Sequence, residues 1–412
     1  MYPSNQTCPV HFRDPARSPA SINYSARPTG GTQARLRGRE LLVPDLDLGQ
    51  FECRAVVDWV KLRFTIGRQT HLSHLRRLIG DRLGAKPHVA PGDATLTGHS
   101  TVFVVTVQEP EKSEVDAIFN DIARKHGIVG DILIDAIEIS VDFRPHVPSD
   151  RARAELFGVL QRSFWTSRDV FSAQNDRPRC FGAEMKGRKM HRLFRIFEEE
   201  ELNGTTLGKR AKIDSSIWLD AKVDTPASAD GTLYVGARNA SIRWRLMDKV
   251  KDQQNRKTGT FKALSDAEKR VRVEVTLSQP ELGAKTGLHR LHDLQTFRFT
   301  TLQKKFFRFM LPTFQATPEK DNLHPMLNVW IDRMRIERFL KTGILGLEWS
   351  DRARDHFRKP HLAELKKTRR SASATRAKKK KRPLPVSRNY VAYEDLCWRI
   401  QASLRHLGER WR

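Results

Sequence analysis

The sequence predicts an α+β protein built on a mixed, mostly antiparallel sheet with helices packed on one face. Two observations lead to this fold class. Several stretches alternate apolar and polar residues with the period of two that is typical of half-buried strands. Amphipathic stretches with helical spacing lie between them. The order strand, strand, helix, strand, helix, hairpin, strand favours two-layer packing of the ferredoxin-like kind, with the other face of the sheet open.

The strands are predicted from alternation alone. In the first of them Val60, Leu62 and Phe64 share one side, and Lys61 and Arg63 share the other. Strands are expected over residues 56–66, 100–108, 132–143 and 269–277.

The helices are predicted from apolar stripes together with start and stop signals. The segment 111–127 is the clearest, because its apolar residues lie on one stripe and a glycine ends it. Helices are also expected over residues 71–84 and 149–165.

Composition divides the rest of the chain. The first 48 residues are rich in Pro, Ser, Arg and Gly without an apolar period, which predicts a disordered arm. The later segments interleave aromatic and basic residues at helical spacing, and a low-complexity basic stretch follows them. The expected parts are a disordered arm (1–48), the α+β domain (49–280), a smaller helical lobe (281–365), a disordered basic linker (366–388) and a C-terminal helix (389–412).

The charge of the chain points to a polyanionic partner. Lys and Arg number 74 against 48 Asp and Glu, which gives a net charge of +26. Nucleic acid is the first candidate and an anionic membrane surface the second. No apolar run is long enough to span a bilayer. The four cysteines are far apart in the sequence, which is typical of free thiols in a reducing compartment and favours the cytoplasm.

The segment 231–250 is expected to form a β-hairpin with one apolar and one basic face. Its turn would lie near Arg238 and Asn239, because asparagine tolerates the backbone of tight turns. Alternation places Tyr234 on the polar face of the first arm. The cations that share that face in the second arm are Arg243, Arg245 and Lys249.

Acidic residues are expected on the same non-core surface. Because alternate side chains of a strand share one face, Glu138 and Asp142 of one predicted strand are expected on this surface. Glu274 of another strand is expected on it too, together with Arg272. Glu138 and Asp142 are roughly 13 Å apart along their strand, so they do not both reach one ion unless the strand bends. Two interpretations stay open: salt bridges with the arginines, or oxygen ligation of Mg²⁺ or Mn²⁺.

Other chemistries lack their motifs. The sequence has no P-loop and no G-x-G-x-x-G opening a helix, so nucleotide hydrolysis is not indicated. It has no G-x-S-x-G and no H-hydrophobic-H pair of the commonest tyrosine nickases. His289 and His292 are expected to be ordinary surface or core histidines.

With these residues in view, the chain resembles the Rep_trans-type replication initiation factors of rolling-circle plasmids, filamentous phages and some integrative elements. The resemblance covers roughly residues 56–277. It is based on the segments VDWVKLRF, DAIEISVDF, TLYVGARNASIRWRLMDK and RVRVEVTL, in that order.

The resemblance implies an origin-binding nickase. A tyrosine would become joined to the 5′ phosphate and leave a 3′-OH, with a divalent metal, Mg²⁺ or Mn²⁺, held by acidic residues. The basic residues Arg243, Arg245 and Lys249 would offset charge on the phosphate. Origin DNA is the implied partner, with a host helicase as a further one. Residues expected to hold DNA are Arg238, Arg272, Lys378, Lys379, Lys380 and Lys381.

One position departs from the pattern. Members usually have a second tyrosine in an Arg-x-Tyr-x-Lys setting, and here that position is Met247. Tyr234 is then the best candidate nucleophile, with a structural phenol as the alternative. Two non-enzymatic readings stay open: an origin-binding protein of the same ancestry that does not nick, and an RNA-binding protein that uses a sheet face.

Overall fold

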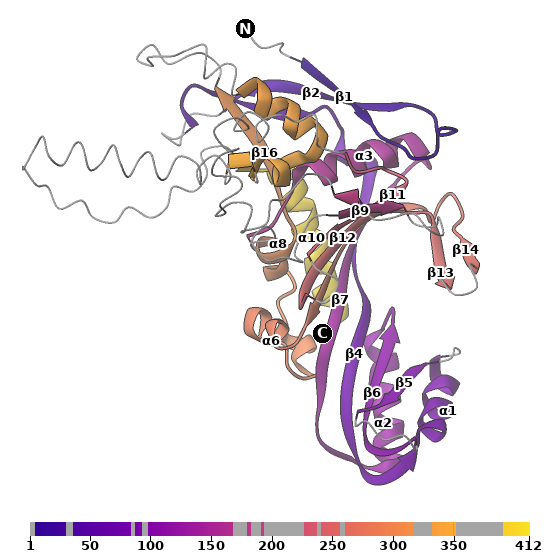
Figure 1. The fold of residues 1–412 in the computed structure, drawn as a ribbon. Helices are drawn as coiled ribbons and strands as arrows, with labels where there is room; N and C mark the ends of the chain where they lie inside the picture. Colours follow the sequence, from indigo (N-terminus) through magenta and orange to yellow (C-terminus); the bar gives the residue numbers. More distant parts are fainter. Residues whose placement is uncertain are drawn as a thin grey trace, which may run out of the picture. The chain divides into compact units, whose positions relative to one another are not determined.

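The computed structural model of the 412-residue chain shows strands and helices in two compact units, each made from three separate stretches of sequence (Figure 1). The first unit comprises Met1–Asp47, Asp150–Leu233 and Arg308–Glu394. The second comprises Leu48–Ser149, Tyr234–Phe307 and Asp395–Arg412. The structure describes residues 5–29, 36–83, 87–92, 98–167, 179–182, 191–192, 226–236, 240–255, 260–315, 332–348, 350–351 and 390–412.

The second unit is organised on an antiparallel sheet, which confirms the predicted α+β class. Its strands follow the order β12-β15-β7-β4-β6-β5. Each predicted strand is present and most are longer than expected. Their bounds are β4 (Phe51–His71), β5 (His88–Pro91), β6 (His99–Gln108), β7 (Ile128–Pro145), β12 (Ile242–Lys249) and β15 (Arg270–Ser278).

Helices complete this unit because the apolar residues of the strands need cover on one face. Helices α1 (Leu72–Leu83) and α2 (Lys112–His126) pack on each other and on β4. A 3-10 turn, η2 (Leu48–Gln50), leads into β4. Short helices follow β15 in the sequence: α6 (Glu281–Thr286), α7 (Asp293–Thr296) and α8 (Thr301–Phe306).

The C-terminal helix α10 (Glu394–Arg410) is part of the second unit. Its apolar stripe includes Ile400 and Leu404, which have no exposed surface. Near its end the Arg410 guanidinium donates to the carbonyl of Ala55 in β4 at 2.7 Å. The predicted terminal helix is therefore a core element of this unit.

Replacing Leu404 by Ala should destabilise the protein by about 2–5 kcal/mol, because the buried site cannot close around the missing methyl groups. Trp398→Ala on the same helix is the control, because Trp398 is 64% exposed, and it should change stability by at most about 0.5 kcal/mol. Urea unfolding of both variants checks this. Equal losses would mean that α10 is not anchored through this stripe.

The first unit contains a second antiparallel sheet in the order β1-β2-β3-β16-β17, with β8 also paired to β16. Helix α3 (Asp150–Ser163), at the predicted position, packs on β1 and β2. Residues 332–348 are helical. The strands of this sheet are β1 (Asn5–Val10), β2 (Ala20–Pro28), β3 (Arg39–Pro44), β8 (Phe164–Trp165), β16 (Arg308–Gln315) and β17 (Tyr390–Ala392). The short strands β9 (Arg179–Gly182) and β10 (His191–Arg192) pair with each other and are not part of this sheet.

Three predictions about the chain differ from this structure. Residues 5–44, predicted to be a disordered arm, contain β1, β2 and β3, because Ala20, Ile22 and Tyr24 alternate inward among polar neighbours. The 281–365 stretch is not a separate helical lobe: α6 to α8 belong to the second unit and β16 to the first. The segment between β12 and β15, for which no strand was predicted, contains a hairpin, β13 (Lys251–Asn255) and β14 (Thr260–Ala263).

The basic linker 366–388 lies outside the described residues. Among the residues that the structure does describe, no helix has the length and apolar character needed to cross a membrane.

Candidate functional site

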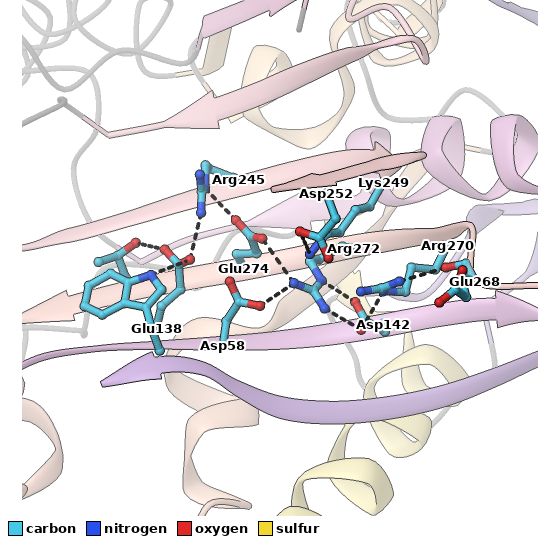
Figure 2. A network of polar contacts seen from close by, with 12 residues as sticks. Asp58, Glu138, Asp142, Arg245, Lys249, Asp252, Glu268, Arg270, Arg272 and Glu274 are labelled. Carbon is cyan, nitrogen blue, oxygen red and sulfur yellow. Dashed lines mark hydrogen bonds and ion pairs between the residues drawn. The ribbon is translucent and has the colours of Figure 1, made fainter. Parts of the chain in front are cut away.

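The candidate site lies on the polar face of four neighbouring strands in the second unit (Figure 2). The register aligns Arg245 of β12 with Glu274 of β15, and Glu274 with Ser140 of β7. Two residues farther along, Met247 lies opposite Arg272, which in turn lies opposite Asp142. Side chains two residues apart project to the same face, so acids and arginines from separate strands meet.

One half of the site is formed around Arg245. Its Nη2 lies 2.7 Å from Glu138 Oε1, and its Nε lies 2.5 Å from Glu274 Oε2. Glu138 also accepts from Trp59 Nε1 at 2.9 Å and from the hydroxyl of Thr276. Glu138 is therefore held by fixed donors, whereas the contact of Glu274 Oε2 is an ion pair without hydrogen-bond geometry.

The other half is formed around Arg272. This guanidinium binds Asp142 through two nitrogens, with Nη2 to Oδ2 at 2.7 Å, and it also donates to Asp58. Arg270 Nε adds a contact to Asp142 at 2.9 Å. Asp142 was expected as a metal ligand, but the structure commits both of its oxygens to arginines.

Asp58 takes the place that was expected for Asp142. Carboxylate oxygens of Asp58, Glu138 and Glu274 all lie within 4.8 Å of one another. Sequence reasoning missed Asp58 because strict alternation puts it on the core side with Val60. The register shifts between Val57 and Trp59, and such a bulge moves one residue out of alternation.

The expected open face is largely closed at the level of these side chains. Glu138, Arg272 and Glu274 have at most 3% of their surface exposed, and Asp142 has 6%. Arg245 is the accessible member, with 29% of its side chain exposed. A negatively charged ligand would therefore reach the site from the side of Arg245.

Burial and the neighbouring arginines together shift the pKa values of Glu274 and Asp142 in opposite net directions. Burial raises the pKa of Glu274 to about 7, opposed by Arg245 and reinforced by the nearby charge of Glu138. Burial also disfavours the charged form of Asp142, but Arg272, and then Arg270, more than offset it, so its pKa is lowered. Glu274 is the group of this network that exchanges a proton near neutral pH.

Tyr234 lies at half-buried depth on β11 (Gly231–Val235), the strand that neighbours β12. Burial acts to lower the pKa of Arg245, whereas Glu274, Glu138 and then Tyr234 raise it, so the net shift is upward. The phenol is thus close enough to Arg245 for electrostatic interaction.

The remaining predicted residues divide into described and undescribed positions. Arg243 lies half-buried on β12. Lys249 lies at the opposite end of β12 from Arg243, and its Nζ is 3.4 Å from Asp252 Oδ1. Arg238 and the cations Lys378, Lys379, Lys380 and Lys381 lie outside the described residues.

The three converging carboxylates fit a hard divalent cation in ligand type. Magnesium and manganese prefer oxygen ligands, and opposite ligands of Mg²⁺ are about 4.2 Å apart. The carboxylate oxygens of the three residues lie up to 4.8 Å apart, which is slightly more than the distance between opposite ligands of Mg²⁺. Two buried oxygens at the site, Glu274 Oε2 and Ser140 Oγ, lack a hydrogen bond within the described structure. A cation here would compete with Arg245 for the same carboxylates.

The raised pKa of Glu274 predicts a pH-dependent cation affinity. Without metal, the folded protein binds the extra proton, so this group's contribution to stability is complete below its ordinary pKa and disappears as pH rises toward 7. A cation needs the carboxylate, so Mn²⁺ should stabilise the protein more at about pH 8 than at about pH 6. When the Mn²⁺ concentration is about a hundredfold above its Kd, the free energy of unfolding should rise by about 2.7 kcal/mol.

Thermal unfolding with and without Mn²⁺ at the two pH values tests this. Glu274→Gln should remove the gain, and Glu52→Gln, at an exposed ion pair with Arg144, should retain it. A Mn²⁺ effect that is equal in both variants would exclude this site as the cause.

Comparisons with known proteins do not assign the chain to a family. No protein-family profile matches the chain. No curated protein matches it either.

Proposed function

We propose that the protein is a replication initiator that binds an origin and nicks one DNA strand through Tyr234, with a divalent metal, to start rolling-circle replication. The observation that carries the proposal is the convergence of Asp58, Glu138 and Glu274 beside Arg245, within electrostatic reach of Tyr234. A phenol, a guanidinium and hard-cation ligands are the groups that phosphodiester transfer uses. The resemblance to Rep_trans-type initiators supports the same reading.

The proposed reaction exchanges one phosphoester for another. The Tyr234 oxygen attacks the phosphorus, the bond from phosphorus to the 3′ oxygen breaks, and a 5′-phosphotyrosyl link forms. The phenolic proton passes to solvent, a proton from solvent reaches the leaving 3′ oxygen, and Glu274 stays a carboxylate that would hold the cation. A bound Mg²⁺ or Mn²⁺ would polarise the phosphodiester. Arg245, with Arg243 on the same strand, would offset the charge that develops on the phosphate.

The experiment uses a library of negatively supercoiled plasmids that carry random inserts, incubated with the full chain and Mn²⁺ or Mg²⁺. We expect nicked circles with protein attached to the 5′ end at one enriched sequence. Denaturing gels and sequencing of the protein-linked ends read this out. Nicks that carry a free 5′ phosphate, or no nicks with either cation, would contradict the proposal.

A second candidate is an origin-binding protein that does not nick. Two observations favour it: Met247 occupies the position of a family tyrosine, and Arg245 already compensates Glu138 and Glu274 without a cation. This candidate predicts enrichment of one duplex sequence by binding alone, with no protein-linked end. Either protein would act in the cytoplasm, where Cys8, Cys53 and Cys397 are kept as thiols.

A further inference from the structure

Arg245 and Arg272 are held in the acidic network in different ways (Figure 2). Arg272 is 1% exposed, binds Asp142 through two nitrogens and also donates to Asp58. Arg245 turns a different nitrogen to each of two carboxylates, and 29% of its side chain is exposed. Arg272 is therefore fixed inside the network, whereas Arg245 reaches into it from the surface.

The two contacts of Arg245 are not equally well aligned. Its Nη2 donates a hydrogen bond to Glu138 at 2.7 Å. Its Nε lies 2.5 Å from Glu274 Oε2, but neither of these atoms has a hydrogen-bond partner within the described structure. A planar guanidinium binds a carboxylate best when two parallel N–H groups point at it. One guanidinium thus neutralises two carboxylates here without matching the geometry of both.

The charges of the network also leave it short of one positive unit. Its carboxylates carry four negative charges when all are ionised, and its arginines supply three positive charges. The members are Asp58, Glu138, Asp142 and Glu274, with Arg245, Arg270 and Arg272. The neighbouring pair of Lys249 and Asp252 adds no net charge. Because buried carboxylates need compensating charge, a divalent cation in the place of Arg245 would balance the network.

A second observation marks the same place as a cation site. Ser140 lies directly across from Glu274 in the register of β7 and β15, so the two side chains share a face. The hydroxyl of Ser140 is fully buried and has no hydrogen-bond partner within the described structure. Hard cations prefer oxygen ligands, and this oxygen would join the three carboxylates that lie within 4.8 Å of one another.

We infer that Arg245 is a placeholder, a side chain that neutralises the cation ligands until a divalent cation binds and displaces it toward solvent. Arg272 stays in place in both states and keeps Asp142 neutralised. The displaced guanidinium of Arg245 then becomes available to a phosphate of DNA, so cation binding and DNA binding strengthen each other. The exchange itself does not depend on the reaction, whereas its effect on DNA rests on the proposed function.

The first test follows Arg245 in the wild-type chain by limited modification with phenylglyoxal, which reacts with accessible guanidinium groups, and by mass spectrometry of the peptides. Since 29% of the side chain is exposed without a cation, full displacement by Mn²⁺ should raise its modification rate about threefold. Arg63, 48% exposed in its ion pair with Asp135, is the internal control and should not change. A rate for Arg245 that Mn²⁺ leaves unchanged or lowers would overturn the inference.

The second test measures Mn²⁺ affinity by electron paramagnetic resonance of the unbound ion. Arg245→Met removes the competing charge and should bind Mn²⁺ at least about tenfold more tightly than the wild type. Arg63→Met removes a positive charge from the same sheet and should stay within about twofold. Equal affinities of the two variants for Mn²⁺ would contradict the placeholder role.

Thermal unfolding shows whether the Arg245→Met variant is folded. Without metal it has two buried carboxylates that lack their arginine, so it should unfold at a lower temperature than the wild type. Mn²⁺ should raise its unfolding temperature by more than it raises that of the wild type, because the cation then replaces the lost charge. A smaller or equal rise would count against the exchange. The labelling of wild-type Arg245 does not depend on the stability of this variant.

Binding to a mixed-sequence single-stranded oligonucleotide tests the link to DNA. At constant ionic strength, saturating Mn²⁺ should raise the affinity of the wild-type chain about fivefold, and Arg245→Met should lose this gain. If Mn²⁺ exposes Arg245 without any gain in affinity, the link to DNA is wrong.

Nicking of supercoiled plasmid, scored in parallel, separates this inference from the proposed function. If Mn²⁺ exposes Arg245 but no nick forms, the proposed function fails and the exchange stands. If nicks form while Arg245 stays covered, the exchange fails and the proposed function stands.

Discussion

Tyr234→Phe should abolish nicking and the covalent protein–DNA link, with a loss of about four orders of magnitude or more in rate. The substitution removes the phenolic oxygen that we propose as the nucleophile and leaves the ring in place on β11. Arg245, the acids and the fold are unchanged, so binding of DNA and of Mn²⁺ should be retained. The rate is measured on supercoiled plasmid, and the link by radiolabel transfer to the protein.

Tyr24→Phe is the matched control. Tyr24 is fully buried in the first unit, and its hydroxyl has no hydrogen-bond partner within the described structure, so its loss should leave nicking unchanged. If Tyr234→Phe still forms the link, the nucleophile is another residue. If both variants lose activity, the assay reports folding and not chemistry.

Arg272→Met should be the most destabilising single substitution in the site, at about 3–5 kcal/mol. Arg272 is 1% exposed and neutralises Asp142 and Asp58 at once. Methionine preserves much of the volume but leaves the buried carboxylate of Asp142 and the half-buried carboxylate of Asp58 without their main partner. Denaturant unfolding of the purified protein measures the loss.

Arg63→Met is the control, because the ion pair of Arg63 with Asp135 is partly exposed, and it should cost no more than about 1 kcal/mol. The double variant Arg272→Met/Asp142→Leu should recover part of the stability, since it removes one of the orphaned charges. A loss under about 1 kcal/mol for Arg272→Met would show that the network is not a stabilising element.

The same network predicts how the stability of the folded protein changes with pH. The pKa of Asp142 is lowered in the folded protein, so its contribution to stability is present above its ordinary pKa and is lost as pH falls through the folded value. Glu274 acts in the opposite sense between its ordinary pKa and about 7. Both contributions are altered when the arginines are removed.

Period-two alternation was a reliable guide to the large sheet. The strands and helices of residues 51–163 lie close to their predicted positions, because each has a clear apolar stripe and a stop signal. Alternation also placed Glu138, Glu274, Arg245 and Arg272 on one face, since the parity of a regular strand fixes the direction of each side chain.

The rest of the site depends on features that the alternation of residues along a strand cannot predict. The bulge at Asp58 is a register shift between strands that are distant in sequence, so only the paired structure reveals it. The burial of Glu138 and Glu274 depends on how closely the arginine side chains pack against them. The strand β16 was read as helical because its aromatic and basic residues also fit helical spacing.

The division of both units among separated stretches has a consequence for synthesis. On the ribosome, chains generally fold domain by domain as each becomes complete. Here the unit that holds the acidic cluster needs α10, so its core stays unfinished until translation has passed residue 400. A nascent chain would have the strands with Tyr234 and Glu274 long before it has the helix that stabilises them. The candidate site would therefore reach its folded form only after α10 has been synthesised and has packed on the sheet.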